Sequence, residues 1–297
     1  MKDSEFPYRG RIAPSPTGWL HVGHARTFWT AYARAREAGG VLVLRNEDLD
    51  PLRSKAEFAR AMLEDLHWLG MHWHEGPDVG GTFGPYSQSE RRGLYLSVWR
   101  RLLDRGFLYP CSCSRKELSG IAQAPHESAA PGPERHEKTR FESDEGPMYP
   151  GTCRPKAGAR PAKAPAGPAG ANWRFRVPDG EVVAFEDGHF GPQRFVAGED
   201  FGDFPVWRRD DVPAYQLAVV ADDEAMRITE VVRGADLLLS TARQILLYRA
   251  LGFAPPRWYH CRLVVDEQGE RLAKRHDALA IRTLREQGRT REEVRGG

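Results

Sequence analysis

The amino-acid sequence predicts an α/β protein whose parallel sheet is assembled from the two ends of the chain, with a different module inserted between them. Two observations carry this prediction. Helical and strand-like patterns alternate over residues 21–110 and return from 211 to 275, and such alternation places helices on the faces of a parallel sheet. The stretch 111–210 instead contains polar, irregular segments and three of the four cysteines.

The first elements follow from hydrophobic spacing. Ala25, Phe28, Trp29 and Tyr32 recur at the spacing of one helix face. The apolar run in "GGVLVLR" indicates a short buried strand bounded by glycines. A helix followed by such a strand is the expected start of a parallel sheet.

Glycines mark the ends of two further amphipathic helices, in "KAEFARAMLEDLHWLG" and "SERRGLYLSVWRRLLDRG". Ordered structure is expected to resume at "NWRFRV". The α/β pattern then returns in "YQLAVVADD", "RITEVVRG" and "ADLLLSTARQILLYRALG", and "WYHCRLVVDEQGERLAKRHD" indicates strands that lead to a basic loop.

Composition sets the expected domain boundaries. From Pro155 to Ala171 only Pro, Ala, Gly, Lys and Arg occur, so this segment lacks the apolar side chains that a core needs. The expected organisation is a first half of the sheet domain in 1–110, an inserted module in 111–210 with mobile loops near 120–147 and 155–171, a second half in 211–275, and a short tail in 276–297.

The overall numbers exclude several classes of protein. The 297 residues are 40% hydrophobic and 28% charged, which is typical of a soluble globular protein. The sequence contains no apolar run of about 20 residues and its N-terminus has no secretory signal, so we expect a cytoplasmic protein without membrane contact. The net charge of +2 is too small to indicate a nucleic-acid partner, although a local basic patch is compatible with it.

The stretch "RIAPSPTGWLHVGHAR" at residues 11–26 contains the clearest motif. Prolines and a glycine shape a loop directly before a helix start, where unsatisfied N–H groups favour a phosphate. His21 and His24 could then donate hydrogen bonds to a phosphate whose charge grows during a reaction, and Gly23 leaves room for a nucleotide. The alternative is an ordinary helix start with two solvated histidines.

This motif closely resembles the signature of the glutamyl-type class I aminoacyl-tRNA synthetases, in which residues 21–24 correspond to the HIGH sequence. "VLRNEDLDPLRS" is similar to the strand and loop of the family's glutamate pocket, and residues 215–252 resemble its second half. "RLAKR" stands where the family has its KMSKS loop. The resemblance implies a Rossmann-type parallel sheet with an inserted connecting module.

The reaction implied by this resemblance is the activation of L-glutamate by ATP, with Mg²⁺ accompanying the nucleotide, to give glutamyl-adenylate and pyrophosphate. His21 and His24 would stabilise the transferring phosphate, and Lys274 would hold the β- and γ-phosphates. Ala273 replaces the usual serine of this loop, while Lys274 and Arg275 keep its positive charge. The implied ATP-binding residues are Pro14, Thr17, Gly23, His24, Lys274 and Arg275.

Glutamate carries two carboxylates and one ammonium, so its pocket needs both signs of charge. By resemblance, Arg11 and Arg233 are the basic residues, and an arginine matches a carboxylate with two parallel N–H groups. Glu47 would bind the ammonium, and Ser15 and Tyr215 would supply hydroxyl groups. Each of these charged residues alone could instead be a surface ion pair.

Two aspartates beside Glu47 are weaker candidates for that pocket. Asp48 and Asp50 lie in "EDLDP", a sequence that also suits a turn and a cap for the next helix.

Cysteines form a second candidate site. Cys111, Cys113 and Cys153 offer three sulfur ligands and leave one place in a tetrahedral zinc site. Chemistry alone suggests water, His126 or His136 as the fourth ligand. The order C-x-C…Y-x-x-x-C resembles the zinc site of short paralogues in the family and implies Tyr149 instead, although 35 residues separate Cys113 from Tyr149. One structural Zn²⁺ is the expected cofactor.

The remaining thiol and a group of histidines suggest packing rather than metal binding. Cys261 in "WYHCRLVV" is expected to be a small core residue. His67, His72 and His74 lack ligand partners at helical spacing, so we expect them to contribute to packing and to the surface.

The acceptor of the activated glutamate is the least constrained expectation. Only 23 residues follow Lys274, too few for a domain with its own core, so no anticodon-binding domain is expected. A chain of this kind resembles the short paralogues that transfer glutamate to the queuosine base in the anticodon of tRNA(Asp). Arg282, Arg285 and Arg289 could contact RNA phosphates, and a monomer is expected.

Three alternatives remain open at this stage. The chain could be a minimal enzyme that charges the 3′ end of tRNA(Glu), or a catalytically silent RNA-binding paralogue. A nucleotidyltransferase can also place HxGH at a helix start. The intact histidine and glutamate-pocket residues count against the silent paralogue, and the arginine-rich pocket counts against the nucleotidyltransferase.

Overall fold

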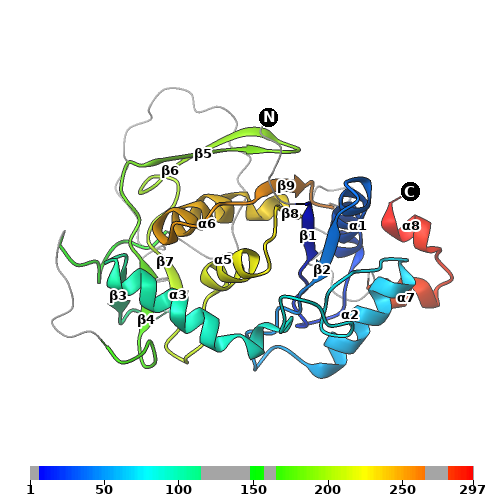
Figure 1. The fold of residues 1–297 in the computed structure, drawn as a ribbon, viewed down its shortest axis with the longest axis horizontal. Helices are drawn as coiled ribbons and strands as arrows, with labels where there is room; N and C mark the ends of the chain where they lie inside the picture. Colours follow the sequence, from blue (N-terminus) through cyan, green and yellow to red (C-terminus); the bar gives the residue numbers. More distant parts are fainter. Residues whose placement is uncertain (1–6, 115–147, 157–164, 265–279, 297) are drawn as a thin grey trace, which may run out of the picture.

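The computed structural model describes residues 7–114, 148–156, 165–264 and 280–296 (Figure 1). Its strands are β1 (Arg9–Ile12), β2 (Val41–Leu44), β3 (Leu108–Cys111), β4 (Asn172–Phe175), β5 (Val182–Asp187), β6 (Gly191–Val196), β7 (Phe204–Trp207), β8 (Glu230–Gly234) and β9 (Arg257–Cys261). Its helices are α1 (Val22–Glu37), α2 (Ala56–Trp68), α3 (Arg92–Asp104), α5 (Tyr215–Ala225), α6 (Leu238–Leu251), α7 (Ile281–Glu286) and α8 (Arg291–Arg295), with short 3₁₀ turns at Gln88–Glu90 and Ala235–Leu237.

The two ends of the chain build one central layer, as the sequence predicted; we call it the central sheet, although its strands form two hydrogen-bonded ladders, β1–β2 and β6–β5–β9–β8. β1 pairs with β2 in parallel, and β8 pairs with β9 in parallel. The two pairs meet where the N–H of Thr229 donates to the carbonyl of Arg9 (2.9 Å) and the N–H of Arg9 donates to the Thr229 hydroxyl (2.9 Å). Residues more than 200 positions apart therefore share one layer (Figure 1).

The sheet is mixed rather than wholly parallel. The hairpin of β5 and β6 is antiparallel, and its end at Asp187 pairs in parallel with Trp258 of β9. Part of the stretch between 111 and 210 thus forms an edge of the central sheet. Periodicity alone did not predict this contact, because it depends on strands that are distant in the sequence.

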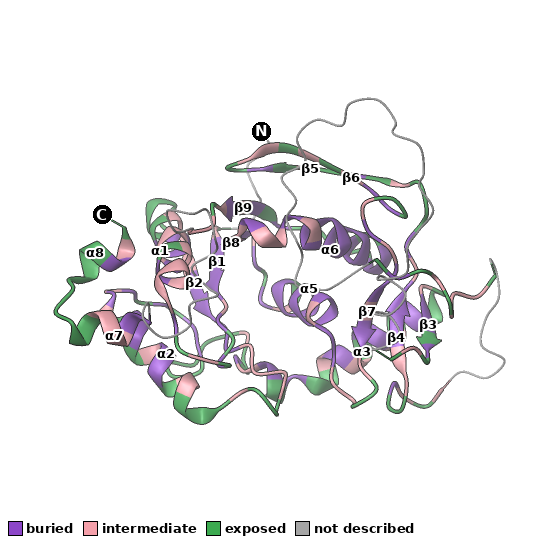
Figure 2. Cartoon of the chain, turned by 180° about the vertical axis from the view of Figure 1, so that it is seen from behind, coloured by how far each residue is buried: buried purple, intermediate pink, exposed green. Residues whose placement is uncertain are grey.

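The antiparallel sheet β3–β4–β7 forms a second layer. Trp99 of α3 packs against it, with its ring 5.1 Å from that of Trp173 and 6.5 Å from that of Trp207 in edge-on contacts. The same core continues to α5 and α6. Helix α6 is buried on almost every side (Figure 2). This core reaches from the antiparallel sheet to β5, β8 and β9, whereas Ile12, Leu42 and Leu44 belong to a second core with α1 and α2.

The predicted helices around the first half of the sheet are confirmed. Ala25, Phe28 and Tyr32 are buried on one face of α1, and Trp29 is half-buried. The glycines expected at helix ends, Gly70 and Gly106, follow α2 and α3 in left-handed conformations with φ of +80° and +82°. Both would be strained with any other side chain.

The C-terminal helices pack onto α1 and α2 rather than extending away from them (Figure 1). Arg282 lies 3.4 Å from a carboxylate oxygen of Asp65 and 4.1 Å above the ring of Trp19. Arg289 pairs with Glu293 (3.4 Å). Of the arginines expected to contact RNA phosphates, Arg282 is half-buried and already paired with a carboxylate; its contact with RNA stays a prediction.

None of the helices within the described ranges combines the length and the apolar character needed to span a bilayer.

Candidate active site

The helix start that the sequence predicted to bind phosphate is built by reciprocal capping. His21 is the N-cap of α1, and its Nδ1 accepts a hydrogen bond from the N–H of Gly23 (3.1 Å). In return, the N–H of His21 donates to Nδ1 of His24 (3.2 Å). The two imidazoles lie 3.8 Å apart between ring centroids. Both rings are therefore held by the backbone amides that they satisfy.

This capping determines which ring nitrogen of His24 carries a proton. Nδ1 accepts a hydrogen bond, so the neutral ring carries its proton on Nε2. Burial and the neighbouring His21 together lower the pKa of His24 to about 3, which keeps the ring neutral near pH 7. His24 thus presents a neutral Nε2–H donor, suited to an oxygen that gains negative charge.

Gly23 is favoured by the capping itself. A methyl group at this position would lie 2.9 Å from Cε1 and 3.1 Å from Nδ1 of His21. Any side chain would therefore push the His21 ring off its hydrogen bond to the helix. The sequence suggested a glycine that leaves room for a nucleotide, and the structure adds this internal reason.

The loop before α1 packs beside the start of the candidate glutamate pocket. The carbonyl of Pro14 accepts from the N–H of Glu47 (3.0 Å), and the N–H of Thr17 donates to the carbonyl of Ser15 (2.9 Å). The loop that precedes the histidines is thereby tied to the loop that follows β2.

Buried charges surround the candidate pocket. Arg45, completely buried, donates to Asp223 Oδ1 (2.6 Å) and Glu47 Oε1 (3.0 Å), and its Nε lies 3.7 Å from Asp222 Oδ2. Nε of Arg11 lies 3.4 Å from the same oxygen of Asp223. Two of the predicted residues, Arg11 and Glu47, are thus connected through a pair that was not predicted, Arg45 and Asp223.

The same contacts separate the protonation behaviour of the two acids. Burial acts to raise the pKa of Asp223, but Arg45 and Arg11 outweigh it, so the pKa lies below its usual range. For Glu47 burial prevails over Arg45, and its pKa is raised. A cation placed beside Glu47 would favour its charged form, which is the environment expected for an ammonium group.

Tyr215 is surrounded by charged residues of the candidate pocket. It begins α5, and burial raises the pKa of its hydroxyl group. Arg233, Glu47 and Arg11 all act on this hydroxyl electrostatically. The structure therefore brings together four of the five residues that the resemblance assigned to glutamate.

Arg233 is held by several acceptors of the protein. Its Nη1 donates to Gln244 Oε1 (2.9 Å), its Nη2 donates to the Thr241 hydroxyl (2.6 Å), and its Nε donates to Nε2 of His260 (3.1 Å). Arg233 as a whole residue is 5% exposed. A substrate carboxylate would meet an arginine that the fold has already oriented.

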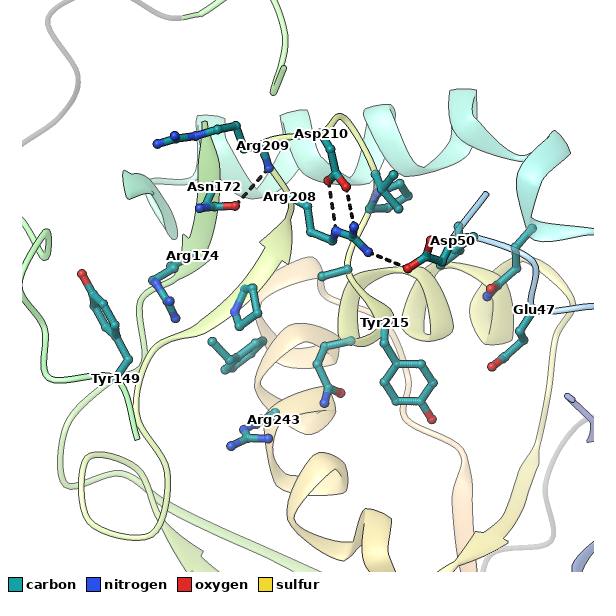
Figure 3. A pocket seen from close by; sticks show the side chains of 18 of the residues that line it. Glu47, Asp50, Tyr149, Asn172, Arg174, Arg208, Arg209, Asp210, Tyr215 and Arg243 are labelled. Atoms are coloured by element: carbon teal, nitrogen blue, oxygen red, sulfur yellow. Dashed lines mark hydrogen bonds and ion pairs between the residues drawn. The ribbon is translucent and has the colours of Figure 1, made fainter. Parts of the chain in front are cut away.

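A cavity of about 1070 Å³ opens beside this cluster (Figure 3). Ser15, Glu47 and Tyr215 line one part of it, and Cys113 and Tyr149 line another. Arg11 and Arg233 are not among its described lining residues. The cavity is at the large end of the range for small-molecule sites, so it has room for more than an amino acid.

Arginines and acidic residues both line this cavity. Arg208 lies between Asp210 and Asp50, with Nη1 3.2 Å from Asp50 Oδ2, and the N–H of Arg209 donates to the side chain of Asn172 (3.0 Å) (Figure 3). The arginines that line the cavity are Arg53, Arg174, Arg208, Arg209 and Arg243. Four acidic residues line the same cavity, Glu47, Asp50, Asp203 and Asp210, so only part of this positive charge is left for an anionic ligand.

Asp50 and Asp48 have structural roles in the described chain. Asp50 Oδ1 accepts from the N–H of Leu52 (3.1 Å), and Asp48 accepts from the N–H and hydroxyl of Ser89. The prediction of a turn is confirmed for Asp50. The prediction that these residues cap the next helix is wrong, because Lys55 is the N-cap of α2.

Cys111, Cys113 and Cys153 come together, with all three sulfur atoms within 4.8 Å of one another. Tyr149 joins them: its hydroxyl lies 3.5 Å from the sulfur of Cys111 and 3.8 Å from that of Cys113, and it accepts from the N–H of Cys153 (2.7 Å). Cys111 ends β3, so the antiparallel sheet positions the cluster.

The cluster fits a tetrahedral zinc ion. Ligands about 2.3 Å from zinc lie roughly 3.8 Å from one another, and the sulfurs of Cys113 and Cys153 lie 3.6 Å apart. Nε of Arg174 donates to the sulfur of Cys111 (3.3 Å), and its guanidinium lies 3.8 Å above the ring of Tyr149. This cation would balance the negative charge of several thiolates on one divalent ion.

The other cysteine and the histidine group behave as expected. Cys261 is half-buried against the core around α1. His67 stacks on Trp73 at 4.4 Å, and Nδ1 of His74 accepts from the N–H of Leu42 (3.0 Å). Among the described residues, the three-cysteine cluster is the group whose geometry could hold a metal ion.

Sequence reasoning missed the residues that hold the predicted ones. Arg45, Asp223 and Gln244 occur in stretches that were recognised, but no local pattern assigns them a role. Their signal is a charged or polar side chain inside an otherwise apolar strand or helix, as Arg45 is after "VLVL". Such residues are almost never fully buried unless they are paired.

Several predicted residues lie outside the described part of the chain. They are Ala273, Lys274 and Arg275 of the basic loop, and His126 and His136.

Comparisons with known proteins define the class. Residues 8–296 match the family of class I tRNA synthetases (E and Q), catalytic domain. The chain belongs to this family and is therefore a ligase of the aminoacyl-tRNA synthetase type.

Relatives within the family are more specific. The chain is 49% identical over 290 residues to a glutamyl-Q tRNA(Asp) synthetase of Nitratidesulfovibrio vulgaris, covering 94% of this chain and 82% of that protein. It is 48% identical to a glutamyl-Q tRNA(Asp) synthetase of Symbiobacterium thermophilum, covering 97% and 84%. A crystal structure of glutamate-tRNA synthetase from Elizabethkingia anophelis superposes with a TM-score of 0.72 at 29% identity, and the match covers 91% of this chain and 53% of that one.

Proposed function

We propose that this protein activates L-glutamate with ATP and transfers it to the queuosine base in the anticodon of tRNA(Asp). Two relatives at 48% and 49% identity, each matched over more than four fifths of its length, carry the name glutamyl-Q tRNA(Asp) synthetase. The observation that carries the proposal is the placement of Glu47 and Tyr215 on the cavity wall, with the buried Arg11 and Arg233 acting electrostatically on Tyr215. That set offers both signs of charge to one small zwitterion.

In the activation step, a carboxylate oxygen of glutamate forms a bond to the α-phosphorus of ATP while the bond to pyrophosphate breaks. The site contributes position and charge stabilisation. His21 and His24 would donate hydrogen bonds to the phosphoryl oxygens at the start of α1, where the helix dipole adds favourable charge. Lys274 and Arg275 would hold the departing pyrophosphate, and Mg²⁺ bound with ATP would neutralise phosphate charge.

Glutamate would lie with its ammonium toward Glu47 and its carboxylates toward the two arginines. Tyr215 and Ser15 would orient it by hydrogen bonds. The carboxylate bound by Arg233 would meet a guanidinium fixed from several sides. This requirement for opposite charges at set places would exclude amino acids that lack a second carboxylate.

An exchange assay with a panel of amino acids tests the activation step directly. The assay is amino-acid-dependent exchange of labelled pyrophosphate into ATP, without RNA. Exchange with glutamate alone supports the proposal. Exchange with another amino acid instead of glutamate, or none at all, would refute it, and the latter result would favour a silent RNA-binding paralogue.

The cysteine cluster would hold one structural Zn²⁺ through Cys111, Cys113, Cys153 and Tyr149. A bound zinc ion would cross-link β3 to the segment that contains Cys153. We expect about one zinc ion per chain, lost in Cys153→Ser, with glutamate activation partly retained because the phosphate-binding helix start lies in a different part of the fold. Elemental analysis of protein purified without chelators checks this, and metal-free protein would contradict it.

The size of the cavity and the arginines that line it support an RNA acceptor. Its arginine-rich wall extends from the glutamate residues to Cys113 and Tyr149, and guanidinium groups bind phosphates well. A nucleotide of the anticodon loop could therefore approach activated glutamate from the side of the cysteine cluster.

A further inference from the structure

Three buried side chains form a line that ends at the arginine of the candidate glutamate site. Asp187 comes from the end of β5, His260 from β9 and Arg233 from β8. Asp187 Oδ2 lies 2.6 Å from Nδ1 of His260, and Nε2 of His260 accepts from Nε of Arg233 (3.1 Å). All three residues are at most 5% exposed.

The direction of every hydrogen bond in this line is fixed by chemistry. An arginine side chain can only donate, so the lone pair of His260 must lie on Nε2 and its proton on Nδ1. That proton is then donated to the carboxylate of Asp187, whose charge holds the tautomer in place. A carboxylate, a neutral imidazole and a guanidinium therefore alternate in a compatible order.

Asp187 is itself held rigidly. Its Oδ1 accepts from the N–H groups of His189 (3.0 Å) and Phe190 (2.9 Å) in the β5–β6 turn, and its Oδ2 accepts from the N–H of His260 (3.2 Å). The carboxylate is thus a fixed point where the hairpin meets the central sheet.

From these contacts we propose that His260 and Asp187 are positioning residues for Arg233 in amino-acid binding. This inference rests on the proposed role of Arg233 in glutamate recognition. Gln244 and Thr241 hold the two outer nitrogens of the guanidinium, and His260 holds its Nε. These three acceptors set both the position and the plane of the group, and the β5–β6 hairpin supplies the charge that orients one of them.

Two substitutions of His260 separate positioning from a purely structural role. The carboxamide oxygen of His260→Gln can replace Nε2 as the acceptor for Arg233, whereas the nitrogen of His260→Asn can replace Nδ1 as the donor to Asp187. We expect His260→Asn to raise the KM for glutamate about tenfold or more, the usual effect of losing a hydrogen bond to a charged group. His260→Gln should stay within about threefold of the wild type, and the KM for ATP should change little in either.

A matched control is Glu230→Gln. Glu230, like Asp187, is a buried carboxylate at one end of a strand, but it lies on β8 and pairs with Arg34 (2.8 Å) and Tyr8 (2.8 Å). We expect this variant to lower the melting temperature without changing the KM for glutamate. If His260→Asn leaves the KM for glutamate unchanged, or raises the KM for ATP equally, the inference is wrong.

A measurement on the wild-type protein removes any dependence on folding of the variants or on the proposed function. Nitrogen-15 NMR of labelled histidines should give His260 a protonated Nδ1 and an unprotonated Nε2 near pH 7. A protonated Nε2 would overturn the inference even if glutamate-dependent exchange is normal. Absence of that exchange in the wild type would instead overturn the proposed function, leaving the NMR result as the test of the histidine contact.

Discussion

The two sides of the candidate site differ in how they are built. At the start of α1, His21 and His24 lie three residues apart and are held by the backbone of one helix turn. Around the candidate glutamate pocket, Arg45 and Asp223 meet across 178 positions of sequence. The helix start is a local arrangement in which His24 is neutral, whereas the candidate glutamate pocket is a non-local network of buried ions.

This difference suits the two tasks that we propose for the site. A phosphate brings its own charge, so neutral donors with a fixed direction are sufficient, and they avoid the cost of burying ions. A zwitterionic amino acid must instead be read by charges of both signs. Those charges must be buried and mutually compensated before the substrate arrives, which is the arrangement of Arg45, Arg11, Asp223 and Glu47.

The buried network should respond most strongly to a single change. Arg45→Met would leave Asp223, Asp222 and Glu47 without the cation they share. Removing one partner of a buried ion pair typically costs about 3–5 kcal/mol, so we expect a loss of about this size in the free energy of unfolding. Urea denaturation at pH 7 measures it.

Arg92→Met is the matched control, because Arg92 and Asp211 form an ion pair in which both side chains are more than one third exposed. Exposed pairs contribute about 1 kcal/mol or less. Equal losses in the two variants would contradict the distinction between the buried network and the surface.

Changes at the helix start should lower the rate of glutamate-dependent exchange and leave the stability of the protein unchanged. His24→Asn keeps an acceptor for the N–H of His21 but removes the Nε2–H donor. We expect glutamate-dependent exchange to fall by about two to three orders of magnitude, as for the loss of one preorganised donor, while the melting temperature stays near that of the wild type. His24→Ala should lose both properties, and near-normal exchange in both variants would refute the role of His24.

A smaller effect is expected in the pH dependence of stability. Burial lowers the pKa of His260 from 6.5 to about 4 in the folded protein; Arg233 also lowers it, whereas Asp187 and Asp236 raise it. Between these values the unfolded chain binds more protons, so the free energy of unfolding decreases as pH falls. The titration of His260 should lower the free energy of unfolding by about 3 kcal/mol between pH 7 and pH 4.

The comparison with His260→Gln isolates this contribution, because glutamine does not titrate. Asp187, whose pKa is lowered below 3.8, loses its own stabilising effect only at more acidic pH. The difference in free energy of unfolding between the two proteins should shift by about 3 kcal/mol in favour of the variant on going from pH 7 to pH 4. A difference that is independent of pH would contradict a neutral buried His260.

The same contrast explains what the sequence could predict. The helix start was identifiable because its histidines and glycine lie within four consecutive positions. The strands in "GGVLVLR" and "RITEVVRG" follow from local patterns, whereas β1 (Arg9–Ile12) was not predicted. The three cysteines were grouped by ligand chemistry, and their sulfurs do converge. In each case the information lies in short segments.

The rest depends on packing between distant segments. The residues around Arg45 do not predict its ion pair with Asp223. The polar turn after β5 likewise does not predict the contact between Asp187 and His260. The capping expected from Asp50 is wrong because α2 begins after Lys55, and the side chain of Asp50 instead contacts Leu52 and Arg208.

The acceptor is the central claim of the proposed function, and labelled glutamate tests it most directly. The purified protein would be incubated with ATP, labelled glutamate and one of three RNAs: tRNA(Asp) with queuosine, tRNA(Asp) without queuosine, or tRNA(Glu). The account predicts that label is transferred only to tRNA(Asp) containing queuosine. Efficient labelling of tRNA(Glu), or of tRNA(Asp) regardless of queuosine, would contradict it.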